Sequence, residues 1–343
     1  MTERTLTMRA LNRALLARQL LLEPSSLAIE DAIEQVGGLQ TQYAPSGYVG
    51  LWTRLARFGR DDLTKALEER TVVQASLMRT TIHMVSAREF WRYAAGIRRA
   101  RRAWALRLAG RAADEAAMIA AAEQIREALA DGPRTVKELG ELGAGFVGNL
   151  GLWVDLVRVP PSGTWERRRA DRLGLAEDWV GPCDASEEEG LVHLVRAYLR
   201  AYGPAAWRDI AAWGGVPIAD ARRGGEALSL VRYRDELGRE LVDLPDAPLP
   251  DPDTPAPVRF LPHWDAALLV HARRAGILPE EYRPRVFSSH NPFSVGTYLV
   301  DGRVVGAWSL REGRVVLDPY EDLSASDRQA VERERDALEA FHA

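Results

Sequence analysis

An internal repeat constrains the fold of this 343-residue chain more than any other feature of its sequence. One block begins at Gly132-Pro133 and returns at Gly203-Pro204. A long helical pattern precedes each pair and ends there, because proline cannot continue a helix. The positions that match after the pair are Val136, Leu139, Leu142 and Gly143 in the first copy, and Trp207, Ile210, Trp213 and Gly214 in the second. The sequence therefore predicts two consecutive copies of one small structural unit.

Each copy has the pattern of three helices followed by two extended segments. A short helix is expected after each Gly-Pro pair, between two longer helices. The longer helices are expected at 114–130 and 145–154 in the first copy, and at 186–202 and 217–228 in the second. The extended segments are 155–160 with 164–168 around the turn Pro161-Ser162-Gly163, and 230–235 with 239–244. Three helices and a β-hairpin form the winged-helix version of the helix-turn-helix, and a generic α+β repeat is the alternative.

The N-terminal region follows a related but more divergent pattern. Its helices are expected at 8–22, 27–38 and 61–70, with Asp61 or Asp62 as the N-cap of the third. Val72–Met78 and Thr81–Val85 have the composition of two strands. Ser86 and Glu89 then fit a capping box that opens a long helix ending near residue 109.

Proline marks the boundary of the last region. Six prolines lie between Pro245 and Pro257, which is typical of a linker. Beyond it, Gly296–Leu310 and Arg314–Asp318 are expected to be strands, with a hairpin turn at Asp301-Gly302 and a closing helix at 325–341. The predicted organisation is a first unit over 1–112, a second over 113–183, a third over 184–244, a linker over 245–257 and a β-rich C-terminal module over 258–343.

Composition places the chain among folded proteins. Hydrophobic residues make up 46% of the chain and charged residues 27%, which argues against global disorder. No apolar run reaches the roughly 20 residues of a membrane helix, and Met1–Ala10 lacks the apolar core of a secretion signal. Cys183 is the only cysteine, which excludes an intrachain disulfide and a cysteine-based zinc site. We expect a soluble, cytoplasmic protein.

Basic residues are unevenly distributed. The net charge of −4 has the wrong sign for a simple DNA-binding protein. However, six arginines and no acidic residue lie between Arg98 and Arg111, and a second cluster runs from Arg167 to Arg172. Such patches can bind phosphate, and a solvated helix face is an equal alternative. Only Lys65 and Lys137 are lysines, so the chain offers almost no amine that could form a Schiff base.

Gln40-Thr41-Gln42 is the most informative short segment. On a helix, residues two apart point about 200° away from each other, so the two glutamines can serve one site only on extended backbone. Gly37-Gly38, just before them, permits the preceding helix to end. A polar helix end is the alternative. The histidines show no metal-ligand spacing, and we expect His193 and His342 to be structural.

Several segments together resemble the AlkZ-type winged-helix DNA glycosylases, and they occur in that family's order along nearly the whole chain. These segments are Arg13–Gln19, Gly38–Gln42, Gly47–Arg54, Met78–His83, Leu261–Asp265 and Val300–Trp308. The resemblance implies a mostly helical α+β fold, with three tandem winged-helix units followed by a barrel-like C-terminal module.

The resemblance also implies an activity. It implies excision of N7-alkylated guanines, including bulky natural-product adducts and interstrand crosslinks, in DNA repair or self-resistance. The scarcity of lysine fits a monofunctional enzyme that leaves an abasic site. The family's catalytic Gln-x-Gln motif maps onto Gln40 and Gln42. A related branch has aspartate at the second position, and this sequence does not. The implied partner is double-stranded DNA containing alkylated guanine. We expect a monomer that uses no cofactor and no metal and associates with the nucleoid when bound to DNA.

Further residues are candidates for support and for DNA contact. The supporting candidates are His83, His263 and Asp265, and a core position for His83 is equally expected. The candidates for DNA contact are Arg54, Arg79, Arg98, Arg101, Arg102, Arg167 and Arg168.

The chemistry of the lesion explains why two glutamines would suffice. An N7-alkylated guanine is already cationic, so it leaves without a strong general acid. Neutral amide carbonyls can then place a water molecule and stabilise an oxocarbenium-like sugar. A regulator without catalysis and a nucleoprotein scaffold are the competing hypotheses. Formation of an abasic site on N7-methylguanine DNA discriminates between them and the enzyme.

Overall fold

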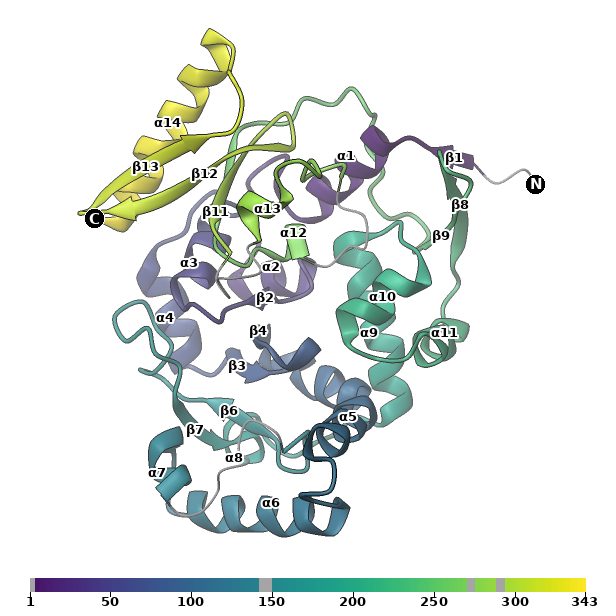
Figure 1. Cartoon of the computed structure of the whole chain (residues 1–343), viewed down its shortest axis with the longest axis vertical. Helices are drawn as coiled ribbons and strands as arrows, with labels where there is room; N and C mark the ends of the chain where they lie inside the picture. The colour runs from purple at the N-terminus through teal and green to yellow at the C-terminus, as the bar shows by residue number, and fades with distance from the viewer. Residues whose placement is uncertain (1–3, 142–149, 270–274, 288–293) are drawn as a thin grey trace.

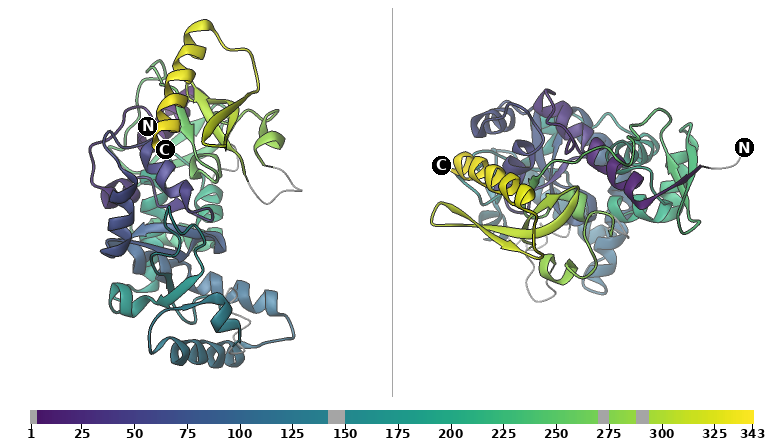
Figure 2. Two further views of the ribbon diagram at one scale, coloured as in Figure 1. Left: turned by 90° about the vertical axis from the view of Figure 1, so that its left-hand side faces the viewer. Right: turned by 90° about the horizontal axis from the view of Figure 1, so that it is seen from above.

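A computed structural model describes residues 4–141, 150–269, 275–287 and 294–343 of the chain. Helices and strands occur in every region, so the fold is mixed (Figure 1). The helices α6 (Glu115–Leu129) and α7 (Val136–Glu141) lie at one end of the long axis, and the C-terminal helix α14 (Ala325–His342) lies at the other (Figure 2). No helix in the described residues is long and apolar enough to cross a membrane.

The N-terminal region follows the sequence prediction closely. Its elements are β1 (Arg4–Leu6), α1 (Met8–Arg18), α2 (Ile29–Gln35), β2 (Leu39–Gln40), α3 (Pro45–Trp52), α4 (Arg60–Glu68), β3 (Val72–Ser76), a 3₁₀ turn (Met78–Thr80), β4 (Ile82–Ser86) and α5 (Ala87–Ala109). Helix α3 was not predicted, because nearly all of its residues are buried and it shows no amphipathic period.

Two predicted helix starts differ in detail from the structure. Gly59, and not Asp61 or Asp62, is the N-cap of α4, and the Asp62 carboxylate accepts a hydrogen bond from the Gly59 N–H at 2.7 Å. Ser86 caps α5 as predicted, accepting from the Glu89 N–H at 3.2 Å. The Glu89 carboxylate does not complete the box, because it binds Arg200 of a distant helix.

The two repeat copies keep their predicted order only in part. The elements of the first copy are α6 (Glu115–Leu129), β5 (Arg134–Thr135), α7 (Val136–Glu141), β6 (Leu156–Arg158), β7 (Arg172–Leu175) and α8 (Ala176–Val180). Those of the second are α9 (Glu187–Tyr202), α10 (Trp207–Gly214), α11 (Ile218–Glu226), β8 (Val231–Asp235) and β9 (Glu240–Asp243). The second copy therefore has the predicted three helices and hairpin.

The third helix and the second strand predicted for the first copy are not found at their predicted positions in the described residues. The first half of the helix expected at 145–154 lies outside the described residues, and 150–154 are not helical. The strand expected at 164–168 is wrong, because the strand is β7 at Arg172–Leu175. The Ser162 hydroxyl donates to the Arg169 carbonyl and accepts from the Asp171 N–H, which folds the intervening segment into a loop.

The sheets connect regions that are far apart in sequence. One six-stranded sheet has the order β2-β4-β3-β6-β7-β5, so strands of the first region and the first repeat copy form a single sheet. Strand β1 pairs in parallel with β8 of the second copy. Helices α5 and α9 pack so closely that a Cβ on Gly190 would lie 2.2 Å from the Gly96 nitrogen. The regions therefore share sheets and helix contacts and are not independent domains.

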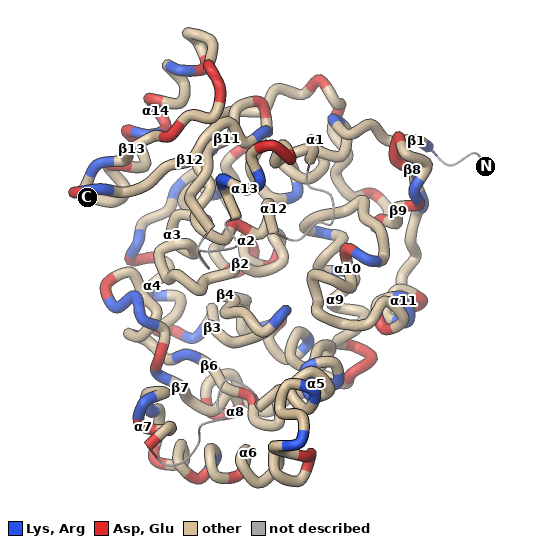
Figure 3. Tube along the Cα trace, viewed as in Figure 1, with Lys and Arg blue, Asp and Glu red and all other residues tan. Residues whose placement is uncertain are grey.

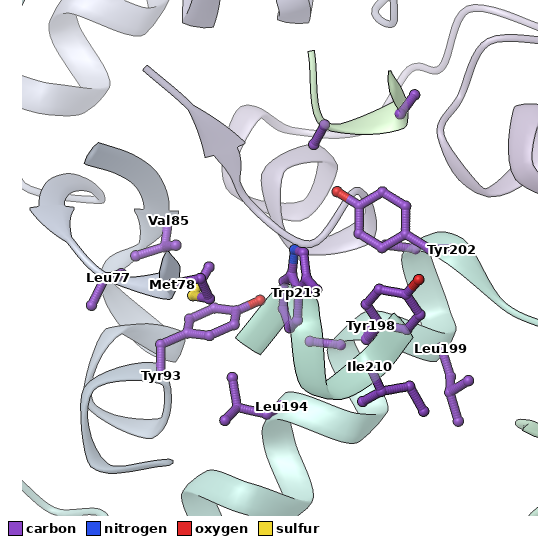
Figure 4. Close-up of a cluster of buried hydrophobic side chains, with 14 of the residues drawn as sticks. Leu77, Met78, Val85, Tyr93, Leu194, Tyr198, Leu199, Tyr202, Ile210 and Trp213 are labelled. Atoms are coloured by element: carbon purple, nitrogen blue, oxygen red, sulfur yellow. The ribbon is translucent and has the colours of Figure 1, made fainter. Parts of the chain in front are cut away.

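A single hydrophobic core joins the N-terminal region to the second repeat copy. In Figure 4 the Trp213 ring of α10 lies between Met78 and Tyr93 on one side and Tyr198 and Tyr202 on the other. The Trp213 ring centroid is 5.5 Å from that of Tyr198 and 6.1 Å from that of Tyr93. This packing places the C-terminal end of α10 beside the turn that connects β3 to β4.

The C-terminal module is an open sheet, so the predicted barrel-like form is not observed. It contains β10 (Arg259–Leu261), α12 (Ala266–Leu269), α13 (Arg283–Val286), β11 (Gly296–Val300), β12 (Arg303–Arg311), β13 (Arg314–Pro319) and α14 (Ala325–His342). The strand order is β10-β11-β12-β13, and the two outer strands do not pair in the described residues. Four strands are too few to close around packed side chains. Helix α14 instead packs beside the sheet through Val331 and Leu338.

Candidate active site

The glutamine pair lies on extended backbone, as one shared site requires. Gly37 and Gly38 both have positive φ angles, 75° and 82°, which end the turn after α2 and lead into β2. Gln40 is the cross-strand partner of His83 in β4. The next N–H, that of Thr41, donates to the Ile82 carbonyl at 2.8 Å. Pairing with β4 therefore fixes the backbone through the first two positions of the motif.

The two side-chain amides are bonded to each other. Gln40 Nε2 donates to Gln42 Oε1 at 2.7 Å, and Arg79 Nη2 donates to Gln40 Oε1 at 2.9 Å. Gln40 is buried, with 6% of its surface exposed, whereas Gln42 is exposed. The Gln42 side chain is therefore accessible from solvent, whereas Gln40 is buried next to it.

His83 lies beside the pair but is held as a neutral side chain. Residues directly opposite each other in an antiparallel pair have side chains on one face of the sheet, about 5 Å apart. The His83 ring is 2% exposed, and its Nδ1 is 3.0 Å from the Thr81 carbonyl. Burial, followed by the charge of Arg79, lowers the pKa of His83 to about 3. At neutral pH the His83 ring is therefore uncharged and cannot donate a proton as an imidazolium ion.

Asp265 makes no hydrogen bond to either glutamine in the described part of the chain. Its carboxylate forms a two-point ion pair with Arg54, with Nη2 to Oδ1 and Nη1 to Oδ2 both at 3.0 Å. Both side chains are 1% exposed, and the Ala267 N–H also donates to Oδ1 at 2.9 Å. Among the described residues Asp265 makes no hydrogen bond to His263. Asp265 and Arg54 therefore hold β10 and α12 against α3, and neither side chain reaches the surface.

His263 instead lines a pocket beside the glutamine motif. The pocket has a volume of about 300 Å³, and its wall includes Tyr43, which follows Gln42 in sequence. The His263 ring lies edge-on to the rings of Tyr43 at 5.6 Å and Trp308 at 5.9 Å. Burial lowers the pKa of His263, so its ring is neutral at neutral pH. Aromatic rings therefore form part of the pocket wall, together with aliphatic residues such as Val49 and Leu310.

His342, which was expected to be structural, also lines this pocket. Burial and the nearby Arg168 and Arg60 lower the pKa of His342 to about 4. Its ring is 5.1 Å from that of Trp165, and neither of its buried nitrogens has a hydrogen-bond partner among the described residues.

Comparison with known proteins decides the family. The sequence model of the family "DNA glycosylase AlkZ-like" matches residues 33–341. The chain belongs to the AlkZ-like DNA glycosylases. No protein with a curated description matches it. Among solved structures, the Streptomyces sahachiroi DNA glycosylase AlkZ is similar, with a TM-score of 0.81 and 21% identity over 98% of this chain and 97% of that chain. This protein is therefore a DNA glycosylase, and its substrate is DNA.

The arginines on α5 of this glycosylase mostly serve its own packing. Arg98 pairs with Asp155 at 3.0 Å, and Arg102 donates to the Leu152 carbonyl at 3.1 Å. Arg101 is 5% exposed and donates to the Leu77 carbonyl. Figure 3 shows basic segments along α5 with acidic segments beside them. Arg98, Arg101 and Arg102 therefore help to hold α5 to its neighbours, and Arg101 is buried in the same way as Arg54.

The second arginine cluster is on the surface. Arg167 and Arg168 are exposed in the loop between β6 and β7. Arg168 donates to the Tyr43 hydroxyl at 3.0 Å and lies 5.7 Å from the centre of the Trp165 ring. This loop brings positive charge from the first repeat copy to the residue next to Gln42. Sequence reasoning missed Tyr43 and Trp308 as members of the site, although Tyr43 directly follows the motif and Trp308 ends a family-like segment.

Proposed function

We propose that this glycosylase hydrolyses the N-glycosidic bond of N7-alkylated guanine in double-stranded DNA, with Gln40 and Gln42 as the catalytic residues. The observation that carries the proposal is the bonded amide pair at the surface, with no carboxylate hydrogen-bonded to it in the described part of the chain. Such a pair suits a leaving group that needs no protonation. DNA repair or self-resistance is the corresponding role.

The proposed reaction uses a lone pair on the side-chain oxygen of Gln42. Its Oε1 accepts one hydrogen bond from Gln40 and keeps a second lone pair. That lone pair orients a water molecule toward C1′ of the damaged nucleotide and stabilises positive charge on the sugar. The C1′–N9 bond breaks, and its electrons neutralise the cationic base. The water oxygen bonds to C1′ and releases its proton to solvent, which leaves free N7-alkylguanine and an abasic site.

We infer a monofunctional enzyme, since both lysines are exposed and form ion pairs with glutamates on their own helices. Lys65 on α4 is 3.6 Å from Glu69, and Lys137 on α7 is 3.7 Å from Glu141. A bifunctional glycosylase needs an amine that attacks C1′. Strand cleavage should therefore require added base or heat after excision.

The aromatic pocket beside Gln42 supports tolerance of bulky adducts and crosslinked bases. Its volume of about 300 Å³ leaves room for an apolar group attached at N7. The Tyr43 and Trp308 rings that line it offer stacking surface to a planar adduct. Exposed Arg167 and Arg168 at the same edge are proposed phosphate contacts, with the partly exposed Arg98 and Arg102 as flanking contacts. We further propose that α9, α10, α11 and the β8–β9 hairpin form a winged-helix unit that docks on the duplex, and that the enzyme acts as a monomer.

The test is a single-turnover time course on duplexes that carry N7-methylguanine, a bulky N7-guanine adduct or uracil. We expect excision of the two cationic lesions and a rate on uracil lower by several powers of ten, because a neutral base leaves as a poor anion. Comparable rates on uracil would overturn the mechanism. Excision of none of the three would favour a DNA-binding regulator.

Variants assign the catalytic residues. Gln40→Ala and Gln42→Ala should each lose at least about 100-fold in rate, similar to removal of one transition-state hydrogen-bond partner, with duplex affinity kept. Gln124→Ala is the matched control, because Gln124 is an exposed glutamine on α6. Excision at the wild-type rate by both motif variants would refute the assignment.

A further inference from the structure

Arg79 bridges the glutamine pair to a helix end that is distant in sequence. Its Nη2 donates to Gln40 Oε1 at 2.9 Å, and its Nη1 donates to the Trp213 carbonyl at 2.7 Å. Trp213 is the next-to-last residue of α10, so its carbonyl has no partner within the helix. The guanidinium thereby satisfies this carbonyl, and the negative end of the helix dipole favours its positive charge.

The backbone around Arg79 is unusual in a way that serves this bridge. Arg79 and Thr80 are consecutive non-glycine residues with φ angles of 54° and 63°. Such angles are uncommon, and for a β-branched threonine they are an outlier. On the other side, Gly215 has a φ of 70°, and a Cβ there would lie 3.2 Å from the Arg79 nitrogen. The strained turn at Arg79 therefore packs directly against the glycine that ends α10, which places the Arg79 side chain within reach of the Trp213 carbonyl.

This contact determines which way both amides point. A guanidinium has donors only, so the Gln40 atom that faces Arg79 must be its oxygen. The Gln40 nitrogen then faces Gln42 and can only donate, so the Gln42 atom that faces it must also be an oxygen. Without Arg79, either amide could rotate by half a turn, and the oxygen and nitrogen of Gln42 would exchange positions.

We propose that Arg79 is a positioning residue of the glycosylase site, which fixes the Gln40 and Gln42 amides in the orientation that hydrolysis uses and couples that orientation to α10. The proposal rests on the proposed function of the glutamine pair. It assigns Arg79 a role other than the DNA contact predicted from the sequence, and it is supported by the hydrogen bond that each terminal nitrogen donates inside the protein.

The decisive experiment is a double-mutant cycle of Arg79→Gln and Gln40→Ala, measured by single-turnover excision of N7-methylguanine at saturating enzyme. Arg79→Gln should slow excision by about 10- to 100-fold, the factor expected for loss of a hydrogen bond to a charged group. The duplex dissociation constant and its salt dependence should stay unchanged. In the Gln40→Ala background, Arg79→Gln should have little further effect, because Arg79 acts through Gln40.

Two results would overturn the proposal. A weaker affinity with a salt slope reduced by about one, at an unchanged excision rate, would make Arg79 a phosphate contact. Fully additive losses in the cycle would show that Arg79 does not act through Gln40. Arg70→Gln is the matched control and should be neutral. Arg70 also has a positive φ angle, 64°, and also donates to a backbone carbonyl, that of Asp178 at 3.3 Å, away from the glutamines.

A readout without substrate separates this proposal from the proposed function. With glutamine-selective ¹⁵N labelling of the full chain, the side-chain amides of Gln40 and Gln42 can be assigned from the two alanine variants. Arg79→Gln should speed exchange of the Gln40 amide protons with water and shift the Gln42 resonance. Arg79→Lys keeps the charge but not the planar two-point fork, so it should give the same change. Unchanged amide spectra would overturn the positioning role, whether or not the wild-type protein excises N7-methylguanine.

Discussion

Replacing Asp265 with asparagine tests whether this aspartate stabilises the fold or supports catalysis. Asp265→Asn keeps the shape of the side chain and removes its charge. Arg54 then stays buried, with 1% of its side chain exposed, without a counter-charge. Its other acceptors are the Gly50 carbonyl at 2.9 Å and Gln19 Oε1 at 3.3 Å, and both are neutral.

The expected loss in free energy of unfolding follows from the burial of Arg54. Removing one partner of a fully buried ion pair costs about 3–5 kcal/mol, because the remaining charge is left uncompensated. The free energy of unfolding of a typical protein is only about 5–15 kcal/mol, so the loss would be a large share of it. With a urea slope near 3 kcal/mol/M, the unfolding midpoint should fall by about 1 M or more.

Urea unfolding followed by tryptophan fluorescence measures this shift. Asp31→Asn is the control, since Asp31 and Arg88 form an exposed pair, with 46% and 59% of their side chains accessible, that should contribute at most about 1 kcal/mol. Arg54→Met combined with Asp265→Asn should recover much of the stability, because no buried charge remains unpaired.

The same variant separates stability from catalysis. At low temperature, where Asp265→Asn is still folded, its single-turnover excision rate should match that of the wild-type enzyme. Unchanged urea stability together with a large fall in the excision rate would refute the reasoning and would return Asp265 to the catalytic site.

Three further outcomes follow from the structure. Gly190→Ala should destabilise the protein by about 1–3 kcal/mol in urea unfolding, because the new methyl group would meet the backbone of α5. The control, Gly140→Ala on α7, has open space and should be neutral or slightly stabilising, and equal effects of the two variants would contradict this prediction. The His83 ring, with its pKa lowered to about 3 by burial and by Arg79, should stay neutral at pH 5 in an NMR titration. The free energy of unfolding should decline as pH falls from about 6.5 toward 3, because only the His83 ring of the unfolded chain binds a proton in that range. An inflection in the NMR shift of this ring between pH 5 and 8 would refute the prediction. Arg167→Gln with Arg168→Gln should reduce the salt slope of duplex binding by up to about two and weaken binding to any sequence, and an unchanged slope would exclude both as phosphate contacts.

Local features of the sequence predicted local structure well. The Gly37-Gly38 break gave the extended backbone at Gln40, since glycine alone adopts positive φ freely. The Ser86 cap, the Asp301-Gly302 turn and the helix after Gly203-Pro204 also lie where they were expected. Each of these depends on a few neighbouring residues, whose preferences can be seen in sequence.

Contacts between distant segments could not be predicted in this way. The basic run on α5 has the composition of a DNA-binding helix, but its acidic and carbonyl partners lie at Leu152, Asp155 and Leu77. Charge pattern alone does not show whether such partners exist. Similarly, Arg54 and Asp265 lie in two family-like segments, and only folding makes them an ion pair.

The sequence by itself therefore identified the glutamine pair, the extended backbone that one shared site would need, and a resemblance to the family of the enzyme. Tertiary structure decided what surrounds the pair. The six-stranded sheet, the pocket beside Tyr43 and the bridge from Arg79 to Trp213 all join segments that are far apart along the chain. The packing of whole elements against one another determines how these segments align. The short-range periodicity of the sequence does not show which surfaces will be in contact.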